Sequence, residues 1–321
     1  MSDLAVPVVL LVLGAVLLTV GAEAFAEHVT AAASKLRVSV LALGVLLAGA
    51  EPEEAVTAML ASGQGHPELA AGDAIGANLV ILTLTVGLAA LFTRLPVSRR
   101  VIEYAVAAAV AGALTVIFLW NGVMSRLEGA LLVLAYVVGV VWVWRRERQP
   151  PMIGELAELS DGVLPVQGTD EDDESSRPLL LVLLGLLGMV AGGFLAVSGA
   201  EGLVDVFDVS ESVIGLTVLG LATSAEMIAL VWAAHRRGVS EVVVAGVVGA
   251  VAYNATVSVG LGALVSPLAI GGGSSVIVIG GVTAVLPLLL FAGRPTGRFP
   301  RTLGVVLVAA YFLCMVWLFW G

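Results

Sequence analysis

Stretches of about twenty apolar residues recur from one end of this 321-residue chain to the other, and this repetition constrains its fold more than any single motif. A helix that rises 1.5 Å per residue needs about 20 residues to cross roughly 30 Å of hydrocarbon. Hydrocarbon offers no partners to backbone N–H and C=O groups, so each stretch must be helical. The chain is 59% hydrophobic and only 12% charged, which excludes a water-soluble globular domain. We therefore predict an all-α membrane protein.

Polar residues divide the apolar sequence into ten segments, each long enough for one crossing. The predicted segments are 4–32, 38–62, 69–93, 101–121 and 127–144, followed by 178–204, 210–235, 241–265, 272–293 and 302–320. The residues just after Met1 include the acidic Asp3 and no basic residue. We therefore expect the first segment to be a helix and not a cleaved signal peptide.

The basic residues support the count and give an orientation. With the N-terminus outside, fourteen of the fifteen lysines and arginines fall in inside loops, and only Arg126 falls on the other side. Cytoplasmic loops are enriched in Lys and Arg. We therefore expect a multi-pass inner-membrane protein with its N-terminus outside.

One long polar stretch, residues 149–177, divides the chain into a first repeat at 1–148 and a second at 178–321. It contains the acidic run Asp170–Glu174, which lacks the glycine and the ligand spacing of a calcium-binding loop. We expect a solvated cytoplasmic linker, with a regulatory calcium site as the weaker alternative.

The two predicted halves share sequence features in the same order. Gly21-Ala22-Glu23 recurs as Gly199-Ala200-Glu201, and Pro52-Glu53 recurs as Ala225-Glu226. Because each half has an odd number of helices, the second half enters the membrane from the opposite side. The sequence thus predicts ten transmembrane helices as two inverted five-helix repeats.

The second predicted helix of each half carries a carboxylate well inside it, Glu53 in the first half and Glu226 in the second. At the bilayer centre a charged side chain costs about 2.5–3.5 kcal/mol on insertion scales, so Glu53 and Glu226 need compensation. Pro52 interrupts the helix beside Glu53, while Thr223 and Ser224 bring hydroxyl groups to Glu226. Inversion would bring both clusters together near mid-membrane, where carboxylate, hydroxyl and carbonyl oxygens suit a hard cation such as Ca²⁺. The alternative is a protonated, hydrogen-bonded pair that only holds helices together.

Further polar residues are candidates for the same site. Asn78 and Asn254, on the third helix of each half, can present amide groups, and Asp73 is as consistent with a ligand as with a structural role. Glu51 and Glu54 fit extra ligands, a proton relay or an aqueous vestibule, and we favour Glu51 slightly. The complete predicted ligand set consists of Glu53, Glu226, Asn78, Asn254, Thr223, Ser224, Glu51 and Asp73.

Other reactive side chains give weaker indications. His28, His66 and His235 lie near predicted helix ends and Cys314 lies in the last segment, so we expect interfacial and packing residues. Glu23, Glu27, Glu201 and Asp205 fit interfacial anchors or ion-entry residues. The arginines are scattered, which is not the footprint of a nucleic-acid-binding protein.

These motifs resemble those of the calcium/cation antiporter superfamily, and the resemblance covers nearly the whole chain. Gly49–Glu53 with Gly76-Ala77-Asn78, and Ala222–Glu226 with Gly249-Ala250 and Asn254, are similar to its Gly-Thr-Ser-x-Pro-Glu and Gly-(Ser/Ala)-Asn-x-x-Asn signatures. The chain departs from them at Ala50-Glu51, Ile81 and Val251. The resemblance implies that Glu53 and Glu226 are central cation ligands.

The resulting hypothesis is a secondary antiporter that exchanges Ca²⁺ against Na⁺ or H⁺ by alternating access. The alternatives are a passive cation channel and an antiporter for another cation, including Na⁺/H⁺ exchange. An intramembrane enzyme would need a catalytic pair at membrane depth, and the sequence has no such candidate. We expect inorganic cations and the lipid bilayer as partners, no cofactor beyond the transported ions, and a monomer or weak homodimer.

Overall fold

The computed structural model describes residues 2–35, 51–93, 95–147, 177–228, 240–271 and 274–320. Nearly all of these residues are helical, which confirms the predicted all-helical membrane fold. The predicted linker falls almost entirely outside the described residues, as do His235, Gly49 and Ala50, so the division at 149–177 stays a prediction.

The helices of the first half follow the predicted apolar segments. They are α1 (Ser2–Lys35), α3 (Pro52–Gly63), α4 (Pro67–Leu79), the π-helix η1 (Val80–Thr85), α5 (Val86–Phe92), α6 (Arg99–Leu119) and α7 (Arg126–Glu147). Pro52 and Pro67 each occupy the first position of a helix, where a missing N–H removes no hydrogen bond.

The helices of the second half also follow predicted apolar segments. Its elements are α9 (Arg177–Phe207), α10 (Glu211–Ile214), the π-helix η2 (Gly215–Leu219), α11 (Gly220–Thr223), α13 (Ser240–Tyr253), the π-helix η3 (Asn254–Ser258), α14 (Val259–Val265), α15 (Ser274–Val285), the 3₁₀-helix η4 (Leu286–Gly293) and α16 (Arg301–Trp320).

In the described part of the chain, eight helical segments are long and apolar enough to cross a membrane. They correspond to eight of the ten predicted segments. The other two, 38–62 and 210–235, lie partly in residues 36–50 and 229–239, which the structure does not describe. The ten-helix count therefore stays a prediction.

The bundle has a buried centre and a lipid-facing periphery. In the segments formed by α4–η1–α5 and by α13–η3–α14, 78% and 83% of the apolar stretch is buried, against 22% in α7 and α16. A helix surrounded by other helices can carry polar groups that the bilayer would exclude. The two central segments are those that contain Asn78 and Asn254.

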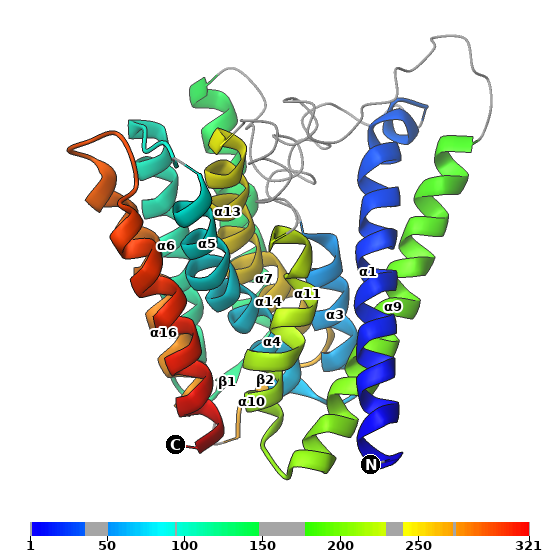
Figure 1. Ribbon diagram of the computed structural model, residues 1–321. Coiled ribbons are helices and arrows are strands. Elements are labelled where there is room, and N and C mark those ends of the chain that lie inside the picture. The colour runs from blue at the N-terminus through cyan, green and yellow to red at the C-terminus, as the bar shows by residue number, and fades with distance from the viewer. Residues whose placement is uncertain are drawn as a thin grey trace.

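Helices α1 and α9 lie side by side along one edge of the bundle (Figure 1). Their backbones touch: a methyl group added at Gly21 would lie 2.7 Å from the Gly185 carbonyl oxygen. Small residues allow this approach in membranes, where van der Waals packing replaces the hydrophobic drive between helices.

The central helices of each half pack against helices of the other half. Helix α3 of the first half packs on α14 of the second, and Ser62 donates to the Gly262 carbonyl at 2.8 Å. Reciprocally, α10, η2 and α11 of the second half pack on α4 of the first. The second helical segment of each half thus lies against the third segment of the other half.

Both termini lie at the same end of the bundle (Figure 1). The first residues of α6, α9 and α16 and the last residues of α7 lie at the opposite end, so most arginine-bearing helix ends gather there. At the terminal end, β1 (Val123–Met124) and β2 (Leu268–Ala269) form a short antiparallel pair. This pair joins the α6–α7 loop to the loop after α14.

Candidate functional site

Helix ends position the acidic residues in the middle of the bundle. Glu51 occupies the N-cap position of α3 without a side-chain capping hydrogen bond, and Glu53 and Glu54 follow Pro52 in the first turn of this helix. The N-terminus of a helix carries free N–H groups and a partial positive charge, which favours carboxylates there. On the other side, α11 ends at Thr223 and Ser224 lies in a turn before helical residues 225–228. The first cluster therefore lies at the start of a helix, and the second lies at a break between helical residues.

Glu53 and Glu226, the two predicted central ligands, meet between the halves. Their carboxyl groups lie close enough to interact directly; Glu53 is buried and Glu226 is partly exposed. An ionised carboxylate can only accept hydrogen bonds. A direct contact between the two carboxyl groups therefore requires a proton on one of them or a cation between them.

A second acidic pair lies beside the first. Glu54 and Asp73 are fully buried. The carboxyl groups of Asp73, Glu51 and Glu226 lie close enough to Glu54 to repel a negative charge on it. Thr223 Oγ1 donates to Asp73 Oδ1 at 3.0 Å, and Ser224 Oγ lies 3.4 Å from Glu54 Oε1. Hydroxyl groups of the second half thus reach carboxylates of the first.

The two predicted amides point in different ways. Asn78 Nδ2 donates to the Val251 carbonyl at 3.2 Å, and its Oδ1 has no hydrogen-bond partner among the described residues. Asn254 instead donates from Nδ2 to Glu51 Oε2 at 3.0 Å. Asn78 therefore offers an oxygen, while Asn254 offers its amino group to a carboxylate.

The buried ionisable side chains of the described residues are acidic rather than basic. Among the side chains that the structure describes, no lysine, arginine or histidine is buried. Within the same residues, no three Asp, Glu, His or Cys side chains are gathered closely enough to hold a metal ion between them. A cation bound here would therefore also need hydroxyl, amide and carbonyl oxygens.

Several features of this region were missed by the sequence analysis. The π-helices η1 and η2 lie close in sequence to Asn78 and Thr223, and η3 begins at Asn254; π-helical turns are frequent at functional sites. The buried Thr57, one turn after Glu53, has a hydroxyl oxygen without a partner in the described part of the chain. Within η3, Ser258 bonds to Asn254, and Thr115 of α6 bonds to the Ala255 carbonyl. Four-residue spacings, such as Glu53 to Thr57 and Asn254 to Ser258, were the available signal.

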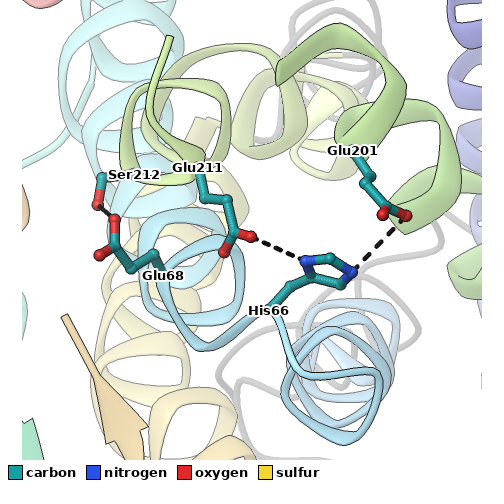
Figure 2. A network of polar contacts seen from close by, with 5 residues as sticks. All are labelled: His66, Glu68, Glu201, Glu211 and Ser212. Carbon is teal, nitrogen blue, oxygen red and sulfur yellow. Dashed lines mark hydrogen bonds and ion pairs between the residues drawn. The ribbon is translucent and has the colours of Figure 1, made fainter. Parts of the chain in front are cut away.

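A separate polar network lies away from the acidic cluster, where the α3–α4 turn meets α9 and α10 (Figure 2). His66 Nδ1 lies 2.8 Å from Glu211 Oε1 and Nε2 lies 3.6 Å from Glu201 Oε2. Glu68 accepts from Ser212 Oγ at 2.6 Å and from the Gly271 N–H at 2.8 Å. His66 and Glu201, which the sequence indicated only as near helix ends, thus join the two halves.

The sodium/calcium exchanger protein family matches residues 6–145 and 177–320, which include most of both halves. The chain belongs to this family. The family consists of membrane transporters and not of enzymes, in agreement with the prediction.

Two curated relatives of similar length match this member of the exchanger family almost end to end. Inner membrane protein YrbG of Escherichia coli (strain K12) is 27% identical to this chain, and the match covers 97% of this chain and 96% of the length of YrbG. The putative antiporter CaxA of Alkalimonas amylolytica is 26% identical to this chain, and the match covers 95% of this chain and 96% of the length of CaxA.

Solved structures of the sodium-calcium exchanger NCX_Mj share the fold. The structure soaked with 10 mM Na⁺ and 10 mM Sr²⁺ has a TM-score of 0.62 and 22% sequence identity, over 98% of both chains. A structure soaked with 2.5 mM Na⁺ and 0.1 mM Ca²⁺ has a TM-score of 0.61. At this identity the similarity supports the fold alone.

Proposed function

We propose that this protein exchanges Ca²⁺ against Na⁺ or H⁺ across the membrane by alternating access, with Glu53 and Glu226 as the central cation ligands. The observation that carries the proposal is the contact between these two carboxyl groups, one from each half, among described residues that include no buried basic side chain. Such a pair is unfavourable in a low-dielectric interior until a proton or a cation compensates its charge.

The chemistry around the pair favours a hard cation. Ca²⁺ takes about 6–8 oxygen ligands in flexible geometry, and the described neighbours supply oxygen: Asn78 Oδ1, the hydroxyls of Thr223 and Ser224, and the carboxylates of Glu51 and Asp73. Transition metals prefer imidazole or thiolate ligands. Na⁺ or H⁺ competing for the same oxygens would couple the two fluxes.

The transport cycle requires access from each side in turn. We propose that the ten helices form two inverted repeats in an inner membrane, with the N-terminus outside and the linker 149–177 in the cytoplasm. The reciprocal packing of α3 on α14 and of α10–α11 on α4 supports this arrangement, as does the name of the relative YrbG. A Cys314→Ser protein with a single new cysteine at Ser2 or Ser175 tests the topology: an impermeant thiol reagent added to intact cells should label only position 2.

The transport experiment is uptake of radioactive Ca²⁺ into proteoliposomes under an outward Na⁺ gradient and, separately, under an outward H⁺ gradient. We expect uptake with at least one gradient, and no exchange in Glu53→Gln or Glu226→Gln, because each removes one charge of the central pair. Full exchange in Glu226→Gln would refute the central site.

The same experiment separates the alternatives. A passive channel would give Ca²⁺ flux without any counter-ion gradient. An antiporter for another cation would take up no Ca²⁺ but would exchange Na⁺ for H⁺, which is measured with radioactive Na⁺ and a trapped pH indicator.

A further inference from the structure

Three buried residues form a hydrogen-bonded chain that ends on a carboxylate of the site. Ser258 Oγ donates to Asn254 Oδ1 at 3.2 Å, and Asn254 Nδ2 donates to Glu51 Oε2 at 3.0 Å. Ser258 and Asn254 are fully buried and Glu51 is 2% exposed. These hydrogen bonds join the second half, which holds Ser258 and Asn254, to the N-cap of α3 in the first half.

The donor and acceptor groups of these residues fix the direction of the hydrogen bonds. An amide has an accepting end and a donating end, whereas a carboxylate accepts only. The amino group of Asn254 must therefore face Glu51, and its oxygen must find a donor elsewhere, which Ser258 supplies. Reversing the amide would place two acceptors against each other in a buried site, where an unmatched polar contact is costly.

The local helix geometry makes the contact available. Asn254 and Ser258 are the first and last residues of the π-helix η3. A helical serine or threonine ordinarily bonds to the carbonyl four residues earlier, as Thr256 does to Ala252 at 2.5 Å. Ser258 instead reaches the side chain of the residue four positions earlier. Thr115 of α6 holds the same turn by donating to the Ala255 carbonyl.

We propose that Ser258 is a positioning residue: it orients the Asn254 amide so that Asn254 holds Glu51 with its carboxylate presented to the transported cation. This inference rests on the proposed function. It assigns Asn254 to the support of Glu51, whereas Asn78, with its free oxygen, contacts the cation directly. A fixed additional carboxylate raises the local negative charge and strengthens binding of a divalent cation.

The test compares Ca²⁺ affinity with maximal transport rate. In Ser258→Ala the half-saturating Ca²⁺ concentration should rise about fivefold, as expected for one neutral hydrogen bond, while the maximal rate stays close to that of the wild type. Ser258→Thr keeps the hydroxyl and should restore the affinity. Should the alanine variant fail to fold, Ser258→Cys, whose thiol is a weak donor, gives the same comparison.

Ser62→Ala is the matched control. Ser62 is also a buried serine that bonds between the halves, to Gly262 at the far end of α3 from the carboxylates. Its loss should lower the melting temperature without changing the half-saturating Ca²⁺ concentration. A role in general packing would make the two serine variants behave alike.

A double-mutant cycle with Glu51→Gln decides whether Ser258 acts through Glu51, with Ca²⁺ binding to the purified proteins measured by calorimetry. The affinity loss caused by Ser258→Ala should largely disappear in the Glu51→Gln background. An undiminished loss, or unchanged affinity in Ser258→Ala, would overturn the positioning role while leaving the proposed function intact. Wild-type protein that neither binds nor transports Ca²⁺ would instead refute the proposed function, and this inference with it.

Discussion

Replacing Gly76 by alanine should disturb the contact on which the site is built. Gly76 of α4 faces η2, and a Cβ atom added there would lie 2.6 Å from the Leu216 carbonyl oxygen and 2.7 Å from its Cα. Ordinary contacts begin at 3.4 Å, so the two helices would have to separate by roughly 0.8 Å. The atoms in the way belong to the backbone and cannot change rotamer.

The cost follows from two opposing effects. Overpacking of this kind costs about 1–3 kcal/mol, which corresponds to a change of roughly 5- to 150-fold in the unfolding equilibrium. Better helix propensity returns at most about 1 kcal/mol. Asn78 lies two residues further along α4, so the shift should also move its oxygen and lower the apparent Ca²⁺ affinity.

Thermal unfolding in detergent, followed by the fluorescence of the six tryptophans, measures the stability change. Gly139→Ala is the control, because a Cβ atom at Gly139 of α7 meets no atom within 4 Å. We expect a lower melting temperature for Gly76→Ala and an equal or higher one for Gly139→Ala. A Gly76→Ala protein with wild-type stability and Ca²⁺ affinity would refute the close packing of α4 on η2.

Three further substitutions test other contacts. Thr115→Val should lower the free energy of unfolding by about 1–3 kcal/mol, because the buried Ala255 carbonyl loses its donor; unchanged denaturation would contradict the role of Thr115 in holding η3. His66→Ala should destabilise the protein by about 1 kcal/mol, since Glu211 loses its partner, and should leave Ca²⁺ affinity unaltered in the same calorimetric assay. Asp73→Asn should raise the melting temperature of the cation-free protein, because one buried carboxylate disappears, and should reduce the further stabilisation produced by Ca²⁺; an equal Ca²⁺-induced shift would exclude Asp73 from the site.

The helical membrane fold could be predicted because its causes are local. A span depends on apolar composition over about 20 residues, and a helix start can depend on one proline, as at Pro52. Eight of the predicted segments therefore agree with the observed helices within a few residues. The break at Ser224 and the π-helices were not predicted, because they depend on packing between helices that are distant in sequence.

The sequence alone also indicated that carboxylates enter the bundle, because a carboxylate within an apolar segment has to enter the membrane interior with it. Glu53 was identified in this way and is buried, whereas Glu226 is partly exposed and the burial of Glu54 and Asp73 was left open. Only the tertiary structure decided what these residues contact: that Glu53 meets Glu226, that Thr223 reaches Asp73, and that Asn254 turns its amino group toward Glu51. Hydropathy is a property of one helix, whereas a contact between side chains depends on the rotation and separation of two helices, which small residues such as Gly76 set at the interface.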